Sequence, residues 1–252
     1  MPKFNILYED EAILAACKPA GLPMHANLDE KRENFVSLLA RQLQARDGQS
    51  GYLGIHQRLD LGTSGVVIFA RSPKANASLA EQFAQHSLVK RYLAITTAQG
   101  HLPHREWDYR CWLGDPLKRG GQVTWRNSCP IDPKIGNFKE AITHFRLLQR
   151  KSGLLFLEAS LKTGRKHQIR AQLAKQKLPI LGDLLYGGAD RLVLHDICEP
   201  ITHPMLHAFY LELLHPLTNQ KMIFCAPLPD DFNRIMERAG VQQIDMLREG
   251  QK

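Results

Sequence analysis

Short runs of apolar residues, many of them rich in β-branched and aromatic side chains, are the dominant pattern along the chain. Runs of this length, bounded by glycine, proline and polar clusters, are typical of β-strands. The run Val66–Ala70 has no polar interruption, which predicts a buried strand. We expect strands at 4–8, 12–17, 66–70, 90–97, 107–113, 123–125, 141–147, 154–161, 206–214 and 222–226.

Other segments carry helical signals. A stripe of apolar residues at helical spacing runs through residues 34–46. Ser72-Pro73 is typical of a helix N-cap followed by proline in the first turn. We expect helices at 34–46, 72–85, 163–177 and 229–238. Because strands outnumber helices and come in runs, the pattern predicts an α+β fold with a central, mostly antiparallel mixed sheet flanked by helices and loops.

Composition narrows the class of partner. The 252 residues carry a net charge of +8, which favours a polyanion because phosphate contacts supply most non-specific affinity for basic proteins. The five cysteines are scattered without a Cys-x-x-Cys pair, so neither a disulfide framework nor a zinc site is indicated. The N-terminus has no apolar stretch of signal-peptide length, and no run reaches the ~18 apolar residues of a membrane helix. We therefore expect a cytoplasmic protein with no membrane partner.

The segment His56–Gly65 is the most informative in the chain. It reads His-Gln-Arg-Leu-Asp-Leu-Gly-Thr-Ser-Gly and leads directly into the predicted strand at 66–70. Its two glycines permit backbone conformations that other residues avoid, so we expect a stiff loop at the mouth of a strand. The loop places Arg58 beside Asp60. Taken alone, such a pair is more often a surface ion pair than a catalytic site.

A second polar segment, Leu161–Arg170, gathers four basic residues within nine positions: Lys162, Arg165, Lys166 and Arg170. In isolation, a solvated basic face and a clamp for phosphate groups are equally good interpretations. We expect Ile169 to face the core and Arg170 to lie beside it.

These segments together resemble the RluA-type pseudouridine synthases. The central motif of that family is roughly His-Arg-Leu-Asp-x-x-Thr-Ser-Gly, and here Gln57 stands in the histidine position while the other motif residues keep their spacing. Further family motifs follow in order, from about residue 6 to residue 229. They are Lys18-Pro19-Ala20-Gly21, Lys90-Arg91-Tyr92, Thr163-Gly164-Arg165-Lys166-His167-Gln168-Ile169-Arg170, Gly182-Asp183-Leu184-Leu185-Tyr186-Gly187, Leu206-His207-Ala208 and His215-Pro216.

The resemblance implies an isomerase that converts uridine in ribosomal or transfer RNA to pseudouridine without cofactor or metal. It implies the pseudouridine synthase fold in one catalytic domain over residues 1–252, with a core at about 6–229. It also implies that no separate N-terminal RNA-binding module is present, and that the protein is a monomer. Asp60 would be the catalytic carboxylate and Arg170 its ionic partner. Tyr92 would line the site beside the target base, and Gly182–Gly187 would be structural support. The residues implied in RNA binding are Arg58, Lys90, Arg165, Lys166 and His167.

Three alternatives compete with this interpretation. A non-catalytic RNA-binding protein or RNA-folding chaperone could share the fold, but binding alone does not require a carboxylate among phosphate-binding residues. The Asp-Leu-Gly-Thr at 60–63 also resembles the phosphate-binding motif of actin-like ATPases, yet the chain has no second copy of it. His101 and His104 could suggest a metal site, but Pro103 between them blocks a helical pairing, so we expect a loop.

Overall fold

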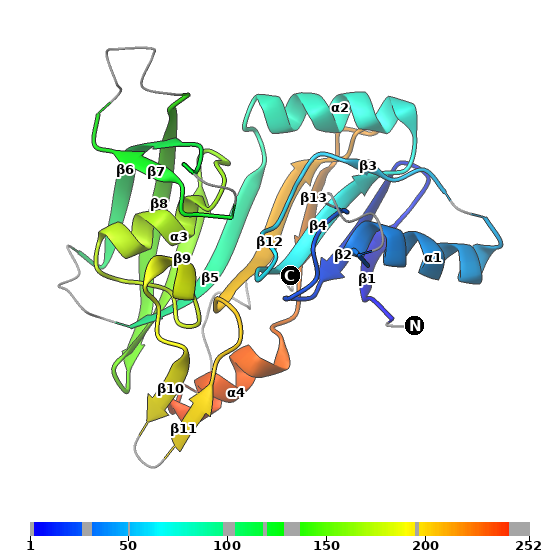
Figure 1. The fold of residues 1–252 in the computed structure, drawn as a ribbon. Coiled ribbons are helices and arrows are strands. Elements are labelled where there is room, and N and C mark those ends of the chain that lie inside the picture. The colour runs from blue at the N-terminus through cyan, green and yellow to red at the C-terminus, as the bar shows by residue number, and fades with distance from the viewer. Residues whose placement is uncertain are drawn as a thin grey trace. The chain divides into compact units, whose positions relative to one another are not determined.

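The computed structural model describes residues 3–26, 32–49, 51–97, 104–117, 120–128, 137–194 and 197–241. Within these ranges the chain forms two compact units (Figure 1). The first comprises the residues up to Lys90 together with His207–Pro229, and the second comprises Arg91–Leu206 and the residues from Asp230 onward. The chain passes from the first unit to the second within β5 (Val89–Thr97).

The first unit is built on a mixed sheet. Strands β1, β2 and β4 pair antiparallel in that order, β12 pairs parallel with β4, and β13 pairs antiparallel with β12. A short strand β3 also pairs with β4. The elements of this unit are β1 (Ile6–Glu9), β2 (Ile13–Lys18), α1 (Phe35–Asp47), β3 (Gly54–Ile55), β4 (Ser64–Ala70), α2 (Pro73–Ala84), β12 (Leu206–Leu214) and β13 (Lys221–Cys225).

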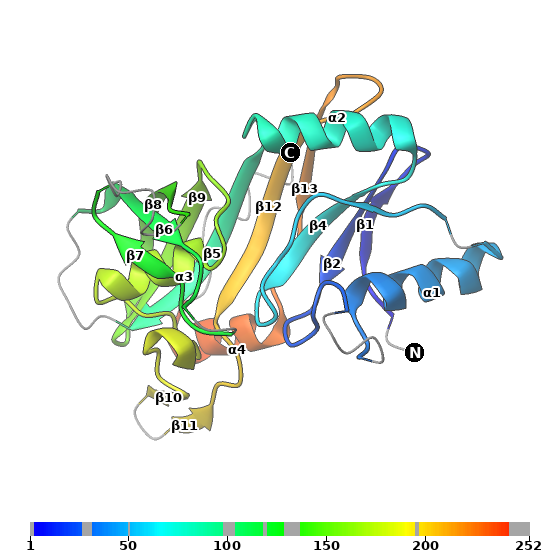
Figure 2. The same ribbon diagram turned by 45° about the horizontal axis from the view of Figure 1, so that its top comes forward.

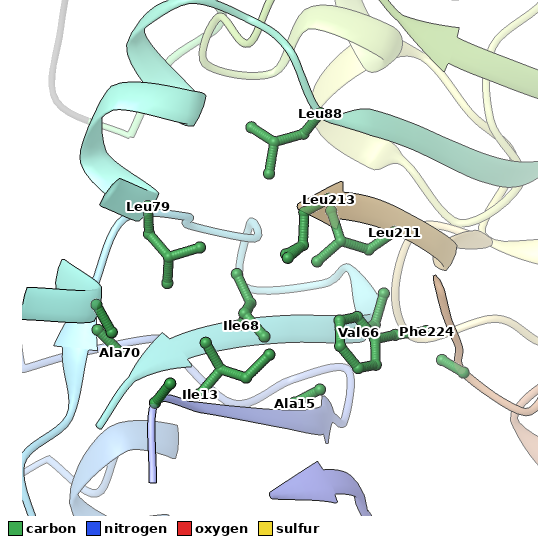
Figure 3. Close-up of a cluster of buried hydrophobic side chains, with 13 residues drawn as sticks. Ile13, Ala15, Val66, Ile68, Ala70, Leu79, Leu88, Leu211, Leu213 and Phe224 are labelled. Carbon is green, nitrogen blue, oxygen red and sulfur yellow. The ribbon is translucent and has the colours of Figure 1, made fainter. Parts of the chain in front are cut away.

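Helices cover both faces of β4, which explains why its apolar run is unbroken. Ile68 belongs to the buried cluster that includes Leu79 of α2 (Figure 3). The next residue, Phe69, points to the opposite face, where its ring lies 6.0 Å from that of Phe35 in α1. Figure 2 shows α1 and α2 on the two sides of this sheet. Every residue of β4 is buried, so the strand is a firm support for the loop that precedes it.

The sequence signals for the first two helices are confirmed in their caps. The Asn34 side chain accepts a hydrogen bond from the Ser37 N–H at the start of α1, and Ser72 does the same for Ala75 at the start of α2. Gly48 ends α1 with a φ of +77°, a conformation that glycine adopts at little cost.

The second unit contains an antiparallel sheet in the order β5, β9, β8, β6, β7. Figure 1 shows α3 lying along one face of it. Ala171 of α3 packs there against Cys111 and Ala141, and the Trp107 indole N–H donates to Gln176 Oε1 at 2.7 Å. The elements of this unit, besides most of β5, are β6 (Glu106–Gly114), β7 (Thr124–Arg126), β8 (Lys139–Lys151), β9 (Leu154–Leu161), α3 (Gln168–Lys175), the 3-10 helix η2 (Leu184–Tyr186), β10 (Arg191–Leu194), β11 (Ile197–Pro200) and α4 (Asp230–Arg238).

The predicted α+β class and the mostly antiparallel mixed sheet are confirmed. The third helix begins later than expected, at Gln168 rather than near residue 163, because His167 has a left-handed φ of +52° that no helix interior allows. The β10–β11 hairpin, β3 and η2 were not predicted. Residues 101–103, which include His101 and Pro103 of the rejected metal motif, lie outside the described residues. In the described ranges, no helix is both long enough and apolar enough to cross a membrane.

A partly buried polar cluster fixes the turn between β1 and β2 in the first unit. Asp10 accepts hydrogen bonds from the backbone N–H groups of Ala12 and Ile13 through Oδ1, and from the Tyr8 hydroxyl through Oδ2. His215 Nε2 lies 2.9 Å from the same Oδ2. Burial opposes ionisation of Asp10, but the hydrogen bonds outweigh it and lower the pKa of this carboxyl.

Asp10→Asn should therefore destabilise the protein by about 1–2 kcal/mol at pH 7. A carboxyl with a lowered folded-state pKa contributes stability above its unfolded pKa of about 3.9, and that contribution is lost as the pH falls through the folded value. The gap between the Asp10→Asn variant and wild type, measured by urea unfolding, should close below about pH 4. The exposed Asp115→Asn serves as control, and a gap independent of pH would contradict the assignment.

Candidate active site

Asp60 occupies the first position of a tight turn. The Thr63 N–H donates to the Asp60 carbonyl oxygen at 3.0 Å, which closes a β-turn over residues 60–63. Aspartate is favoured at this first position because its side chain suits the turn geometry. The turn ends at Ser64, where β4 begins. The acid is therefore carried by a short, hydrogen-bonded segment anchored to a fully buried strand.

Lys18 clamps this turn from the end of β2. Its side chain is only 1% exposed, and its ammonium donates to the carbonyl oxygens of Pro19 at 2.9 Å, Leu61 at 3.3 Å and Thr63 at 2.9 Å. The Gly21 N–H also donates to the Leu61 carbonyl at 2.8 Å. An ammonium has three donors, and three carbonyls of two neighbouring loops use them. The clamp ties the loop after β2 to the Asp60 turn.

The clamp also brings a positive charge near the acid. Burial lowers the pKa of Lys18 to about 8, and the negative charge of Asp60 opposes that fall. At neutral pH the ammonium therefore remains protonated. The buried ammonium is therefore close enough to the acid for the two charges to interact.

The far side of the turn is fixed by the parallel pairing of β4 with β12. Ser64 Oγ lies 2.9 Å from His207 Nδ1, and both side chains are buried. Gly65 has a φ of +125°, and a Cβ at this position would overlap the backbone of Ala208. The glycine thus allows β12 to approach the motif closely.

Burial alternates along the motif itself. Gln57 and Leu59 are buried, whereas Arg58 is exposed, Asp60 is partly buried and Leu61 is 46% exposed. Gln57 Nε2 lies 3.5 Å from the Val66 carbonyl. Gln57, which stands in the family's histidine position, therefore packs against β4, whereas its neighbour Arg58 is exposed to solvent.

Three of the four basic residues in the basic segment of the second unit, Lys162, Arg165 and Lys166, precede α3, and Arg170 lies on it. Arg165 donates from Nε to the Glu140 carbonyl at 2.9 Å, and Lys166 is exposed. His167 Nδ1 lies 3.0 Å from the Tyr186 hydroxyl. Thr163 and Gln168 stabilise this loop, since Gln168 Oε1 accepts from the Thr163 hydroxyl at 2.8 Å and from the Arg165 N–H at 2.9 Å.

Arg170 lies in the first turn of α3 and is buried, as is Ile169 beside it. Its Nε and Nη2 donate to the two carboxyl oxygens of Asp183, each at 2.7 Å. The guanidinium carbon lies 5.1 Å from the centre of the Tyr186 ring. Tyr92 is buried on β5, and the Lys90 ammonium lies 5.8 Å from the centre of the Phe83 ring.

The expected site residues thus fall into two groups by unit. Arg58 and Asp60 share one loop of the first unit, which also contains Lys90. The remaining five belong to the second unit: Tyr92, Arg165, Lys166, His167 and Arg170. No group of three His, Cys, Asp or Glu side chains among the described residues could hold a metal ion.

Sequence reasoning did not foresee the contacts by which three residues hold these groups in place. Lys18 and His207 each lie in a recognised family motif, but nothing in the local sequence shows that either side chain is buried against the Asp60 turn. Asp183 was assigned to a supporting turn, which is confirmed, but its bond to Arg170 was not foreseen. For Lys18, the available signal was a charged residue that directly follows the apolar run Ile13–Cys17.

Comparison with known protein families identifies the family to which this chain belongs. A family model described as RNA pseudouridylate synthase matches residues 12–175 of the chain. The chain belongs to the RluA-type RNA pseudouridine synthases. It is therefore an isomerase that converts uridine in RNA to pseudouridine, and RNA is its partner.

Individual relatives agree with this family. Ribosomal large subunit pseudouridine synthase D of Xanthomonas campestris pv. campestris is 34% identical over 250 residues, which cover 92% of this chain and 68% of the relative. RNA pseudouridine synthase YhcT of Bacillus subtilis is 32% identical over 235 residues, which cover 92% of this chain and 71% of the relative.

Solved structures show the same fold. Human RNA Pseudouridylate Synthase Domain Containing 4 superposes with a TM-score of 0.70 at 22% identity, covering 93% of this chain and 92% of that one. Human RNA Pseudouridylate Synthase Domain Containing 1 gives a TM-score of 0.69 at 23% identity, covering 98% and 94%. The pseudouridine synthase fold expected from the sequence is thereby confirmed.

The contact of Gly65 with β12 can be tested in this synthase by substitution. Gly65→Ala should lower the free energy of unfolding by about 3 kcal/mol or more, because it adds a steric overlap with Ala208 to a strained φ. Gly48→Ala is the matched control, since its φ is also positive but no atom lies within 4 Å of the added Cβ. It should cost only about 1 kcal/mol. Equal losses in chemical denaturation would contradict the close approach.

Proposed function

We propose that this synthase acts through the carboxylate of Asp60 on a uridine of ribosomal RNA. The observation that carries the proposal is an acid on a clamped turn, in the motif where the RluA-type family has its aspartate. The reaction breaks the N-glycosidic bond between N1 and C1′ and joins C5 to C1′, while the proton leaves C5 and N1 gains one. No oxidant, reductant or energy source is consumed, so the chemistry requires only a placed carboxylate and proton transfers.

A uridine in folded RNA must leave its stack before its ribose can reach an acid. Flipping costs a few kcal/mol of stacking and pairing, which contacts to the displaced nucleotide and its neighbours must offset. We propose that the exposed Arg58 fills the space that the base vacates. Tyr92 then packs against the uracil, and Arg170 pairs with Asp60 and orients it.

The remaining basic residues are proposed to hold the RNA backbone. Lys166 is exposed, and Arg165 and His167 are partly buried beside it in the loop before α3. Lys90 is proposed to reach the same backbone. Cationic side chains of this kind release counterions from phosphate groups, which gives affinity without sequence preference. The net charge of +8 is consistent with such a partner.

Ribosomal RNA is the favoured substrate class because several relatives are named ribosomal large subunit pseudouridine synthase D. Transfer RNA is the second candidate and is an outcome of the mapping experiment below. We further propose that the two units act together as one catalytic domain, and that the protein works as a monomer in the cytoplasm.

Asp60→Asn should abolish isomerisation while leaving RNA binding intact. The amide keeps the shape of the side chain but cannot serve as nucleophile or base, so the rate should fall by about 10³-fold or more. Tritium release from RNA labelled at uridine C5 measures the rate, and filter binding measures the affinity. Asp47→Asn, at an exposed residue of the same unit, should match wild type.

The substrate is identified by mapping pseudouridine in total RNA from a deletion strain complemented with each of these variants. Loss at a ribosomal position that only the wild-type and Asp47→Asn genes restore is the expected result. Loss confined to transfer RNA would replace the proposed substrate, and normal turnover by the Asp60→Asn protein would refute the role of Asp60.

Lys166→Ala should weaken binding to all RNA sequences alike. One phosphate contact fewer should reduce the slope of log affinity against log salt concentration by about 1. Lys151→Ala is the matched control, because this exposed lysine lies at the other end of β8 from the Glu140 that contacts Arg165. An unchanged slope for Lys166→Ala would remove this residue from the proposed phosphate clamp.

A further inference from the structure

Arg170 and Asp183 form a buried ion pair in the second unit. Arg170 uses Nε and Nη2 in two parallel hydrogen bonds of 2.7 Å to the two oxygens of one carboxylate. The Asp183 side chain is 1% exposed and that of Arg170 is 10% exposed. Parallel bonds of this type fix the plane and direction of a guanidinium, whereas one bond leaves it free to rotate.

Tyr186 fixes the guanidinium from a second direction. Its ring lies against the guanidinium carbon at 5.1 Å, and the ring is anchored at its far end. The Tyr186 hydroxyl accepts the Val123 N–H at 2.9 Å and lies 3.0 Å from His167 Nδ1. The edge of the guanidinium is thus set by a carboxylate and its face by an aromatic ring.

The backbone around these two residues is equally constrained. The Asp183 carbonyl accepts the N–H groups of Tyr186 at 3.0 Å and Gly188 at 2.8 Å. Gly182 has a φ of +81°, and a Cβ on Gly182 or Gly188 would overlap neighbouring backbone. The turn that carries Asp183 and Tyr186 is therefore closely packed and hydrogen-bonded.

A buried ion pair is a weak source of net stability, because the cost of removing two charges from water offsets their attraction. Its more distinctive effect here is orientation. Asp183 binds one edge of the guanidinium, through Nε and Nη2. These two bonds fix the orientation of the whole Arg170 guanidinium.

We propose that Asp183 and Tyr186 are positioning residues that hold the Arg170 guanidinium in the one orientation its catalytic task requires. The inference rests on the proposed function, in which Arg170 pairs with Asp60. Neither residue needs to touch RNA. Each acts through Arg170, so removing either should slow the isomerisation and leave RNA affinity unchanged.

Asp183→Asn tests the carboxylate, because the amide keeps the size of the side chain and loses the charge. The single-turnover rate of tritium release from C5-labelled RNA should fall by about 10- to 100-fold, the scale expected when a catalytic group is misplaced by about 1 Å. The dissociation constant for the same RNA should stay within about threefold. Tyr186→Phe keeps the ring and loses its anchor, and should give a smaller loss of rate.

Glu158→Gln is the matched control. Glu158 is also a buried carboxylate of the second unit, with a 6% exposed side chain bonded to Arg146 at 3.1 Å. It neighbours Ala159, which pairs with Tyr92, and so projects from the opposite face of the sheet. A comparable fall in melting temperature with an unchanged rate is expected for Glu158→Gln. If both variants lost rate in proportion to stability, the positioning role would be refuted.

Two further measurements separate this inference from the proposed function. In the Arg170→Lys background, adding Asp183→Asn should lower the rate little further, because the guanidinium that Asp183 orients is no longer present. If Asp183→Asn lowered the rate as much in this background as in wild type, Asp183 would act by another route.

The Arg170 Nε–H signal in nitrogen-15 NMR should exchange slowly with water in wild type and rapidly in Asp183→Asn. This NMR measurement does not require enzymatic activity. A wild-type protein without synthase activity would therefore refute the proposed function alone. An exchange rate that is the same in wild type and Asp183→Asn would refute the positioning role of Asp183.

Discussion

The Asp60 turn depends on the buried side-chain ammonium of Lys18, at the end of strand β2. Lys18 is buried and uses its three donors on carbonyl oxygens of its own loop and of the Asp60 turn. Backbone carbonyls at a turn would otherwise require water or a strand partner. By satisfying them with a charged side chain, the fold leaves the turn short and still keeps its acid partly exposed. Because the lysine is at the end of β2, the pairing of β2 with β4 is sufficient to place it.

The same principle recurs in the second unit with the signs reversed. There a buried carboxylate, Asp183, holds a cation, Arg170, and a tyrosine closes over it. In each unit the charged group proposed to take part in chemistry is held by groups from its own unit. Polar groups held in this way need little reorganisation during a reaction, which is the largest source of electrostatic catalysis.

Local patterns predicted the elements well because the determinants of those elements are local. The apolar run of β4 and the caps of α1 and α2 need only their own neighbours in the sequence. The predicted start of α3 was wrong, because the helix begins only after His167, whose left-handed φ a non-glycine residue rarely adopts. The family motifs identified Asp60 and Arg170 as candidates. They could not show what holds either residue, since Lys18 reaches a turn 43 residues away and Asp183 was interpreted as part of a turn.

The parallel contact between β4 and β12 has a consequence for biosynthesis. Ser64 and His207 meet across 143 residues of chain, and the described strands of the second unit all lie between them in the sequence. During translation the N-terminal end of β4 lacks its eventual neighbour on one edge until the polypeptide beyond residue 208 leaves the ribosome. Exposed apolar edges of this kind invite aggregation. The nascent protein therefore carries this unpaired edge until its last strands emerge.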